Sequence, residues 1–142
     1  MDTAYKTTLE LDKVLNRAVQ LCACQETKEM MQALEPAPTI EDERYDLTQT
    51  NAINALLIKN GSPRFGSVRE VRRIVAHARK GGILSMGELL EIAATLRNFS
   101  GLSQWYGLSE HDMLPTDDLF FALAPQPVLE KQISEIIISP EE

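Results

Sequence analysis

The chain has 142 residues, of which 44% are hydrophobic and 25% charged, and its formal net charge at pH 7 is −7. This length suits one domain with one core, and the composition is that of a soluble globular protein. No apolar run approaches the roughly 20 residues of a membrane helix, and the N-terminus lacks the apolar stretch of a signal peptide. We therefore expect a cytoplasmic protein without a membrane partner.

The N-terminal part of the chain predicts two helices, 8–24 and 25–34, because its apolar residues recur at intervals of three and four. We expect the first helix to bury a stripe made of Val14, Leu15, Ala18, Leu21 and Cys22. Cys22 and Cys24 would point about 200° apart on a helix, so neither a disulfide between them nor a shared metal is expected.

A third helix is predicted over 39–59. Thr39 and Asp42 have the spacing of a capping box, and acidic residues occupy the first turn, where the helix dipole favours them. The polar middle of this helix, residues 48–51, has two readings. A hydrogen-bonded seam against another helix is one, and a solvated face is the favoured one.

The rest of the chain predicts four more helices, 68–80, 86–106, 117–123 and 128–138. Phe65 is expected to enter the core from the loop 61–67. Gly81-Gly82 is typical of a left-handed helix end, and Ser85 with Glu88 forms a second capping box. No strand pattern is visible, so the sequence predicts an all-α fold, an irregular bundle of six to seven helices in a single domain over 1–142.

Most of the positive charge lies in one segment. From Lys59 to Lys80 there are seven basic residues and one acid, a net charge of +6, while the remainder of the chain carries −13. Helical spacing places five of the basic residues on the solvent side of the helix 68–80, as a candidate contact for phosphates. These residues are Arg69, Arg72, Arg73, Arg79 and Lys80. A solvated face paired with acidic helices is the simpler reading and is the one favoured.

Catalytic and metal-binding patterns are not apparent. The two histidines, His77 and His111, have no set of ligands at suitable spacing, and zinc needs three or four. The paired carboxylates lie at helix starts, where capping explains them. Neither a nucleophile elbow nor a phosphate-binding loop is recognisable. We expect no catalytic residue, metal or cofactor within residues 1–142.

The C-terminal run Ile136-Ile137-Ile138 is unusually apolar for the end of a chain. It predicts that the natural protein continues beyond these residues. In isolation, the chain would then expose this surface, and a dimer contact is expected there.

Four stretches, in this order, resemble the N-terminal region of bacterial MutS-like proteins of the second type, the Smr-bearing relatives of mismatch-repair MutS. They are TLELDKVLNRAVQLC, PAPTIEDERYDLTQTNAI, NGSPRFGSVREVRRIVAHARKGGILSMGELLEIAATLRNFS and LEKQISEIIISPEE. The resemblance covers essentially the whole chain. Its most specific part is the segment Gly66–Arg72, followed by Gly82–Ser85 and Glu88–Leu90.

The resemblance implies a non-catalytic helical core and lever region. The intact protein would then be an ATP-driven dimeric clamp on branched DNA, on collided ribosomes or on both. It implies that ATP and Mg²⁺ bind in an ATPase domain, and that a nuclease domain cuts, both outside residues 1–142. The partners implied are the rest of the chain, a second copy, and DNA or ribosomal RNA at the basic helix.

Two other classes stay open at this point. One is a stand-alone helical adaptor that binds a partner helix around Trp105, Tyr106 and Phe120-Phe121. The other is a small enzyme, which would need a ligand-sized pocket that brings His77 or His111 together with carboxylates.

Overall fold

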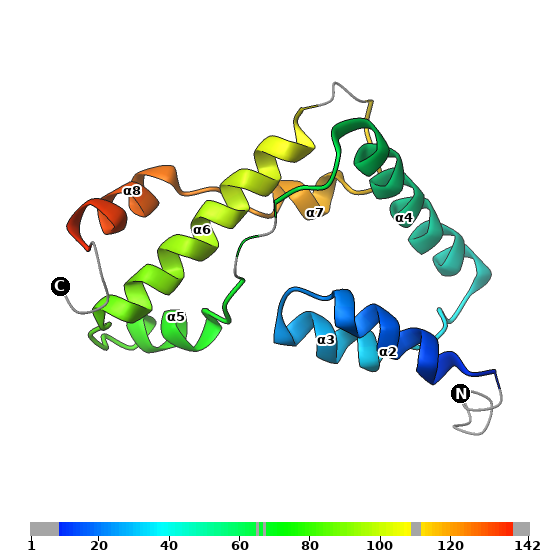
Figure 1. Ribbon diagram of the computed structural model, residues 1–142, viewed down its shortest axis with the longest axis horizontal. Coiled ribbons are helices and arrows are strands. Elements are labelled where there is room, and N and C mark those ends of the chain that lie inside the picture. The colour runs from blue at the N-terminus through cyan, green and yellow to red at the C-terminus, as the bar shows by residue number, and fades with distance from the viewer. Residues whose placement is uncertain (1–8, 65, 67, 109–111, 138–142) are drawn as a thin grey trace. The chain divides into compact units, whose positions relative to one another are not determined.

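The computed structural model describes residues 9–64, 66, 68–108 and 112–137. These residues form seven helices and no strand, which confirms the all-α fold (Figure 1). In chain order the helices are α2 (Leu11–Leu21), α3 (Gln25–Gln32), α4 (Ile40–Asn60), α5 (Arg72–Arg79), α6 (Met86–Tyr106), α7 (Asp117–Phe121) and α8 (Pro127–Ile136). None of these described helices is both long and apolar enough to cross a membrane.

The chain divides into two compact units, Met1–Glu43 and Arg44–Glu142. In the first unit α2 packs against α3, and no described residue of either helix is buried. The buried stripe predicted for the first helix is therefore wrong. Val14 and Leu21 are exposed, and the other three residues of the stripe are half-buried. Two short helices cannot cover each other's apolar faces completely.

The second unit is built on α6, which runs through this unit in Figure 1. The C-terminal end of α6 packs with α4 and α7 around the buried residues Leu56, Trp105 and Tyr106. Its N-terminal half packs on α8 around Ala93, Ile133 and Ile137. The two clusters lie at opposite ends of α6, so this helix joins both parts of the core.

Local signals explain where α5 ends and α6 begins. Gly81 has φ 82°, and the N–H groups of Gly81 and Gly82 donate to the carbonyls of Ala78 and His77, which is the Schellman arrangement. Ser85 then caps α6. Its Oγ accepts from the Glu88 N–H at 3.3 Å, and the Glu88 carboxylate accepts from the Ser85 N–H at 2.8 Å. Both predicted helix-end signals are confirmed.

Side chains of α6 also fix the loop that leads into α5. The indole Nε1 of Trp105 donates to the Gly61 carbonyl at 2.8 Å, and the Asn98 Oδ1 accepts from the Gly66 N–H at 3.0 Å. A Cβ on Gly66 would collide with the Asn98 side chain, so this close approach needs glycine. Phe65, predicted to enter the core, lies outside the described residues.

Helix α5 begins at Arg72, four residues later than predicted. Ile74 is buried and Val68 and Val71 are half-buried, as an inward face requires, but Val75 and Ala78 are exposed. The polar middle of α4 is mainly a solvated face, and its long-range hydrogen bond reaches a turn before α7 rather than another helix. Gln49 Nε2 donates to the Pro115 carbonyl at 2.9 Å, while the side chains around it remain exposed.

The C-terminal isoleucines do not behave alike. Ile136 is 80% exposed, as predicted, whereas Ile137 is only 6% exposed because it packs against α6. The predicted exposure is thus right for Ile136 and wrong for Ile137, and Ile138 lies outside the described residues. Arg97 of α6 ties α8 in place, since it donates to Glu130 Oε1 at 2.9 Å and to Ser134 Oγ at 3.2 Å.

Candidate nucleic-acid interface

Helix α5 separates an inward side from a basic side. Residues seven apart on a helix lie about 20° apart around the axis and about 10.5 Å apart along it. Arg72 and Arg79 are one such pair, and Arg73 and Lys80, the residue that ends the helix, are another. The buried Ile74 lies on the opposite side. The two pairs therefore form one broad basic face, which we call the α5 basic face.

Arg69 does not belong to this face. The sequence analysis placed it on the helix, but α5 begins only at Arg72, so Arg69 lies in the preceding segment. That expectation is wrong for Arg69. The helical spacing also reveals a residue that the sequence analysis did not name. Ala76 lies between the two basic pairs, and its small exposed side chain leaves room for a ligand backbone to come close.

The basic residues project into solvent. Arg69, Arg72, Arg73, Arg79 and Lys80 are all exposed. Within the part of the chain that the structure describes, Arg73, Arg79 and Lys80 form no ion pair, and the described pairs elsewhere join Lys13 to Glu10, Arg97 to Glu130 and Lys131 to Glu135. The exposure of these three cations agrees with the solvated face of the simpler reading, and their pairing with acidic helices is not seen among the described residues.

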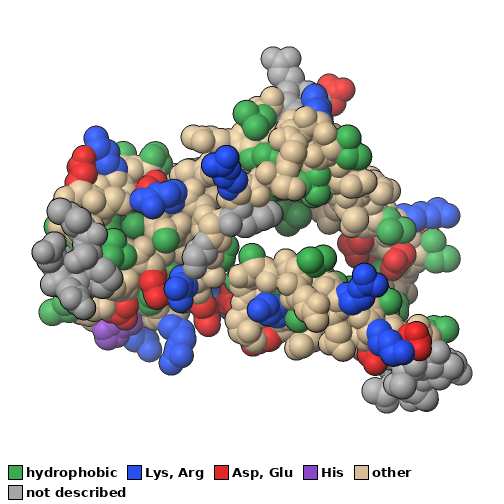
Figure 2. Space-filling model, viewed as in Figure 1, with side chains coloured by type: hydrophobic (Ala, Val, Ile, Leu, Met, Phe, Trp, Pro, Cys, Tyr) green, Lys and Arg blue, Asp and Glu red, His purple; other side chains and the backbone are tan. Residues whose placement is uncertain are grey.

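Helix polarity and a nearby histidine shape the charge at the end of α5. Arg79 and Lys80 sit at the C-terminus, where the helix dipole favours positive charge. The His77 ring packs on Gly82, where any added Cβ would collide with it. The carboxylate of Glu88 at the start of α6 has its pKa lowered, first by the hydrogen bond from the Ser85 backbone and to a lesser extent by His77. Figure 2 shows the Lys, Arg and His side chains gathered at this end of the second unit.

Candidate metal ligands do not cluster in the described residues. No group of three or more His, Cys, Asp or Glu side chains there could hold a metal ion. The two thiols bond locally, Cys22 Sγ to the Ala18 carbonyl at 3.4 Å and Cys24 Sγ to Thr27 Oγ1 at 2.9 Å. His111 lies outside the described residues.

Two pockets in the second unit could hold small ligands, and neither contains a titratable group. One, of about 340 Å³, is almost entirely apolar, and the other, of about 510 Å³, runs along the polar middle of α4. The apolar pocket is lined by Ile53, Leu57, Pro63, Leu102, Trp105, Leu119, Phe120 and Leu123. A pocket that brings His77 together with carboxylates, as the small-enzyme reading requires, is not among them.

The surface expected for a stand-alone adaptor is largely internal. Trp105 and Tyr106 are 7% and 3% exposed, and the Tyr106 ring stacks on Phe120 with centroids 3.8 Å apart. Only Phe121 of that group is exposed. The expectation that these rings form a docking surface is wrong for Trp105 and Tyr106, because they build the core at the C-terminal end of α6.

Comparison with known proteins finds relatives that are named endonuclease MutS2. The chain is 31% identical over 141 residues to that of Agathobacter rectalis, an alignment that covers 97% of the chain and 18% of the relative. The chain is 29% identical over 142 residues to the relative from Lachnospira eligens, an alignment that covers 100% of the chain and 18% of the relative. It is 26% identical over 136 residues to the relative from Clostridium beijerinckii, an alignment that covers 94% of the chain and 17% of the relative. The chain thus spans less than a fifth of these relatives. No family model and no solved structure matches it.

Proposed function

We propose that this chain, a region of a MutS2-like protein, is a helical scaffold that contacts the sugar-phosphate backbone of nucleic acid through the α5 basic face. The observation that carries the proposal is local. Arg73, Arg79 and Lys80 are exposed and form no ion pair within the described residues, although the chain as a whole is acidic. Solvated cations on one helix face suit phosphates, which position a protein without reading sequence.

The acidic remainder of the chain limits where nucleic acid can bind. Charges farther apart than a Debye length, roughly 8–10 Å at ordinary salt, are largely screened. Within each basic pair of this face, the two residues lie about 10.5 Å apart along the helix. A polyanion can therefore be attracted locally at α5 and repelled elsewhere, which would hold it in one place on the scaffold.

We further propose the role of the intact protein from its relatives. They are named endonucleases, and the chain matches less than a fifth of their length. On this proposal the intact protein is an ATP-driven dimeric clamp on branched DNA or collided ribosomes. ATP, Mg²⁺ and the cutting site would then lie outside residues 1–142. This region would transmit the state of the ATPase to the arms of the clamp.

The test of the proposed contact is a binding comparison between matched variants. Three proteins would be compared: the wild-type chain, the α5 variant with Arg73→Glu and Lys80→Glu, and a control variant with Arg17→Glu and Lys131→Glu. Each would be titrated into a fluorescein-labelled four-way DNA junction and into a labelled ribosomal RNA stem-loop, and fluorescence anisotropy would report binding. Arg17 and Lys131 are exposed residues of α2 and α8, so both variants change the net charge equally.

We expect the α5 variant to lose at least about tenfold in affinity and the control variant to bind nearly as well as the wild type. Equal losses in both variants would mean that only total charge matters, and would contradict a site on α5. Absence of binding by the wild-type chain to both probes would contradict it as well. Preference for one probe would decide between DNA and ribosomal RNA.

A further inference from the structure

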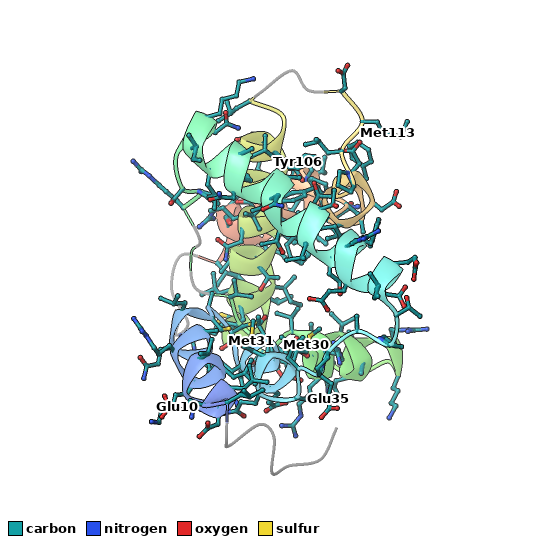
Figure 3. All side chains as sticks on the ribbon, turned by 90° about the vertical axis from the view of Figure 1, so that its right-hand side faces the viewer. Glu10, Met30, Met31, Glu35, Tyr106 and Met113 are labelled. Carbon is teal, nitrogen blue, oxygen red and sulfur yellow. The ribbon has the colours of Figure 1, made fainter. Side chains whose placement is uncertain are left out.

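Two pockets of the second unit adjoin each other. The apolar pocket of about 340 Å³ and the larger one of about 510 Å³ share the side chains of Ile53, Leu57 and Leu119 in their linings. The two pockets therefore meet at one wall made by α4 and α7, and Figure 3 shows α4 running across the front of this unit. A ligand at this wall contacts both linings, which differ in their chemistry.

The apolar pocket has two aromatic side chains in its lining. Trp105 and Phe120 lie with ring centroids 6.1 Å apart and ring planes inclined by 39°. Since Trp105 Nε1 already donates to the Gly61 carbonyl, the one polar atom of this side chain is satisfied and its ring presents apolar surface. Aromatic ligands gain affinity from contact with such rings, and the volume lies at the lower end for ligand pockets. This pocket therefore suits a small flat ring system.

The larger pocket, which we call the amide pocket, supplies hydrogen-bonding groups without charge. Its polar lining residues are Gln49, Thr50, Asn51, Asn54 and Thr116. The side chains of Asn51 and Asn54 are exposed and make no hydrogen bond with other described residues. A side-chain amide presents a donor and an acceptor together, which is the arrangement that pairs with the edge of adenine. The amide pocket can therefore pair with the edge of a heterocycle.

Charge limits what these pockets can hold. Among the described residues, no charged side chain lines either pocket, and the segment Leu47–Ile58 of α4 carries no charge at all. A phosphate or another ion would lose its hydration there without gaining a partner. The buried part of the ligand is therefore neutral. A nucleobase combines the three properties that the pockets select: a flat ring, a donor–acceptor edge and no charge.

We propose that the two pockets together bind one nucleobase. Its ring lies in the apolar pocket against Trp105 and Phe120, and its edge pairs with Asn51 or Asn54. The base can belong to a free nucleoside or to an unpaired nucleotide of a strand. No residue of the α5 basic face lines these pockets, so the inference does not rest on the contact proposed for that face. It also goes beyond that contact, because a base site distinguishes bases and a backbone contact does not.

The indole N–H signal in NMR spectra reports directly on this site, because Trp105 is the only tryptophan of the chain. A nitrogen-labelled chain would be titrated with adenosine, guanosine, cytidine and uridine, and with ribose as the control. These probes carry no phosphate and so cannot respond to the α5 basic face. We expect a saturable shift with a dissociation constant of about 1 mM or less for at least one nucleoside, and no shift with ribose. No shift with any nucleoside would overturn the proposal.

Leu119→Glu and Leu47→Glu are a matched pair of variants. The two leucines are 58% and 53% exposed, so neither substitution disturbs the core, and only Leu119 lines the pockets. Leu119→Glu places a carboxylate at the shared wall, and a bound base would have to displace its water. We expect this variant to bind the nucleoside at least about tenfold more weakly, and Leu47→Glu to bind it like the wild type. Equal losses in both variants would contradict the site.

The hydrogen-bonding edge is tested by Asn51→Ala combined with Asn54→Ala. We expect at least about fivefold weaker binding of the nucleoside and unchanged binding of indole, a flat probe with a single polar atom. Equal losses for both probes would contradict a nucleobase as the ligand. Two DNA hairpins, one with a single unpaired adenine in its stem and one fully paired, separate the two sources of the base. A shift of the indole signal by the first hairpin alone identifies an unpaired nucleotide, and a shift by nucleosides but by neither hairpin identifies a free nucleoside.

Discussion

The hydroxyl of Tyr106 offers the sharpest stability test of the core at the end of α6. It donates to Asp117 Oδ1 at 2.7 Å and shares a hydrogen bond of 2.8 Å with Thr116 Oγ1. Thr116 is only 1% exposed. Tyr106→Phe keeps the stack on Phe120 and removes both bonds. A hydrogen bond to a charged group contributes about 1.5–3 kcal/mol, and a buried hydroxyl left without a partner costs about 1–3 kcal/mol.

We therefore expect Tyr106→Phe to lower the free energy of unfolding by about 2–3 kcal/mol in urea denaturation. The control is Tyr45→Phe in the same unit. The Tyr45 hydroxyl is exposed and donates to the Pro115 carbonyl at 3.3 Å, so its loss should cost less than about 0.5 kcal/mol. Equal effects of the two substitutions would refute the buried network as a source of stability.

The same hydroxyl predicts a dependence on alkaline pH. Burial, the main cause, raises the pKa of Tyr106 above its ordinary value of about 10. The folded state holds this proton more strongly than the unfolded state does. The contribution of the Tyr106 hydroxyl to the free energy of unfolding is therefore fully present below about pH 10, and it is lost as the pH rises through the higher folded pKa. Tyr106→Phe should weaken that decline, and an unchanged decline in the variant would argue against this origin.

The ends of α5 and α6 give two further predictions. Ser85→Ala should lower the free energy of unfolding by about 1 kcal/mol, against almost no change for the exposed Ser62→Ala. NMR titration should show the lowered pKa of Glu88 rising only in part, because the substitution removes the hydrogen bond from the Ser85 hydroxyl and keeps the one from the backbone N–H of residue 85. The ionised Glu88 carboxylate thus contributes its full stabilisation above about pH 4.5, and this contribution is lost as the pH falls through the lowered pKa. Gly81→Ala should lower the free energy of unfolding by roughly 1–2 kcal/mol, because φ is 82° at this position. Gly87→Ala should raise it by up to about 1 kcal/mol, because alanine favours a helix more than glycine does and residue 87 lies within α6. Changes of the same sign in the two variants would contradict this reasoning.

The sequence predicts well those elements whose signals are local. Helix α6 was expected over 86–106 and is Met86–Tyr106, because Ser85 and Glu88 cap it and its apolar residues keep one period for six turns. Helix α4 was expected over 39–59 and is Ile40–Asn60. Its Thr39 Oγ1 accepts from the Asp42 N–H at 3.1 Å, as a cap should.

Features that depend on distant contacts were predicted less well. The start of α5 follows a loop whose Gly66 N–H is bound by Asn98, 32 residues further along the chain, and no local pattern reveals that bond. The amphipathic stripe of α2 was recognised, but only a large partner surface would bury it. Ile137 is buried for the opposite reason, since α6 happens to cover it.

The candidate site divides in the same way. Exposure of Arg72, Arg73, Arg79 and Lys80 follows from helical period alone, so it could be read from the sequence. Arg69 could not be placed, because its position depends on where the helix begins. The lack of ion pairs on Arg73, Arg79 and Lys80, among the residues described, depends on where acidic side chains lie in space, and only the structure supplies that.

The salt dependence of nucleic-acid binding tests the central claim most directly. If four phosphates are contacted, log K falls with log salt at a slope of about −3.6, or roughly 100-fold in affinity between about 50 and 200 mM salt. We predict that slope for the wild-type chain and about half of it for Arg73→Glu with Lys80→Glu. A wild-type slope near zero, or the same slope in both proteins, would contradict a phosphate contact at the α5 basic face.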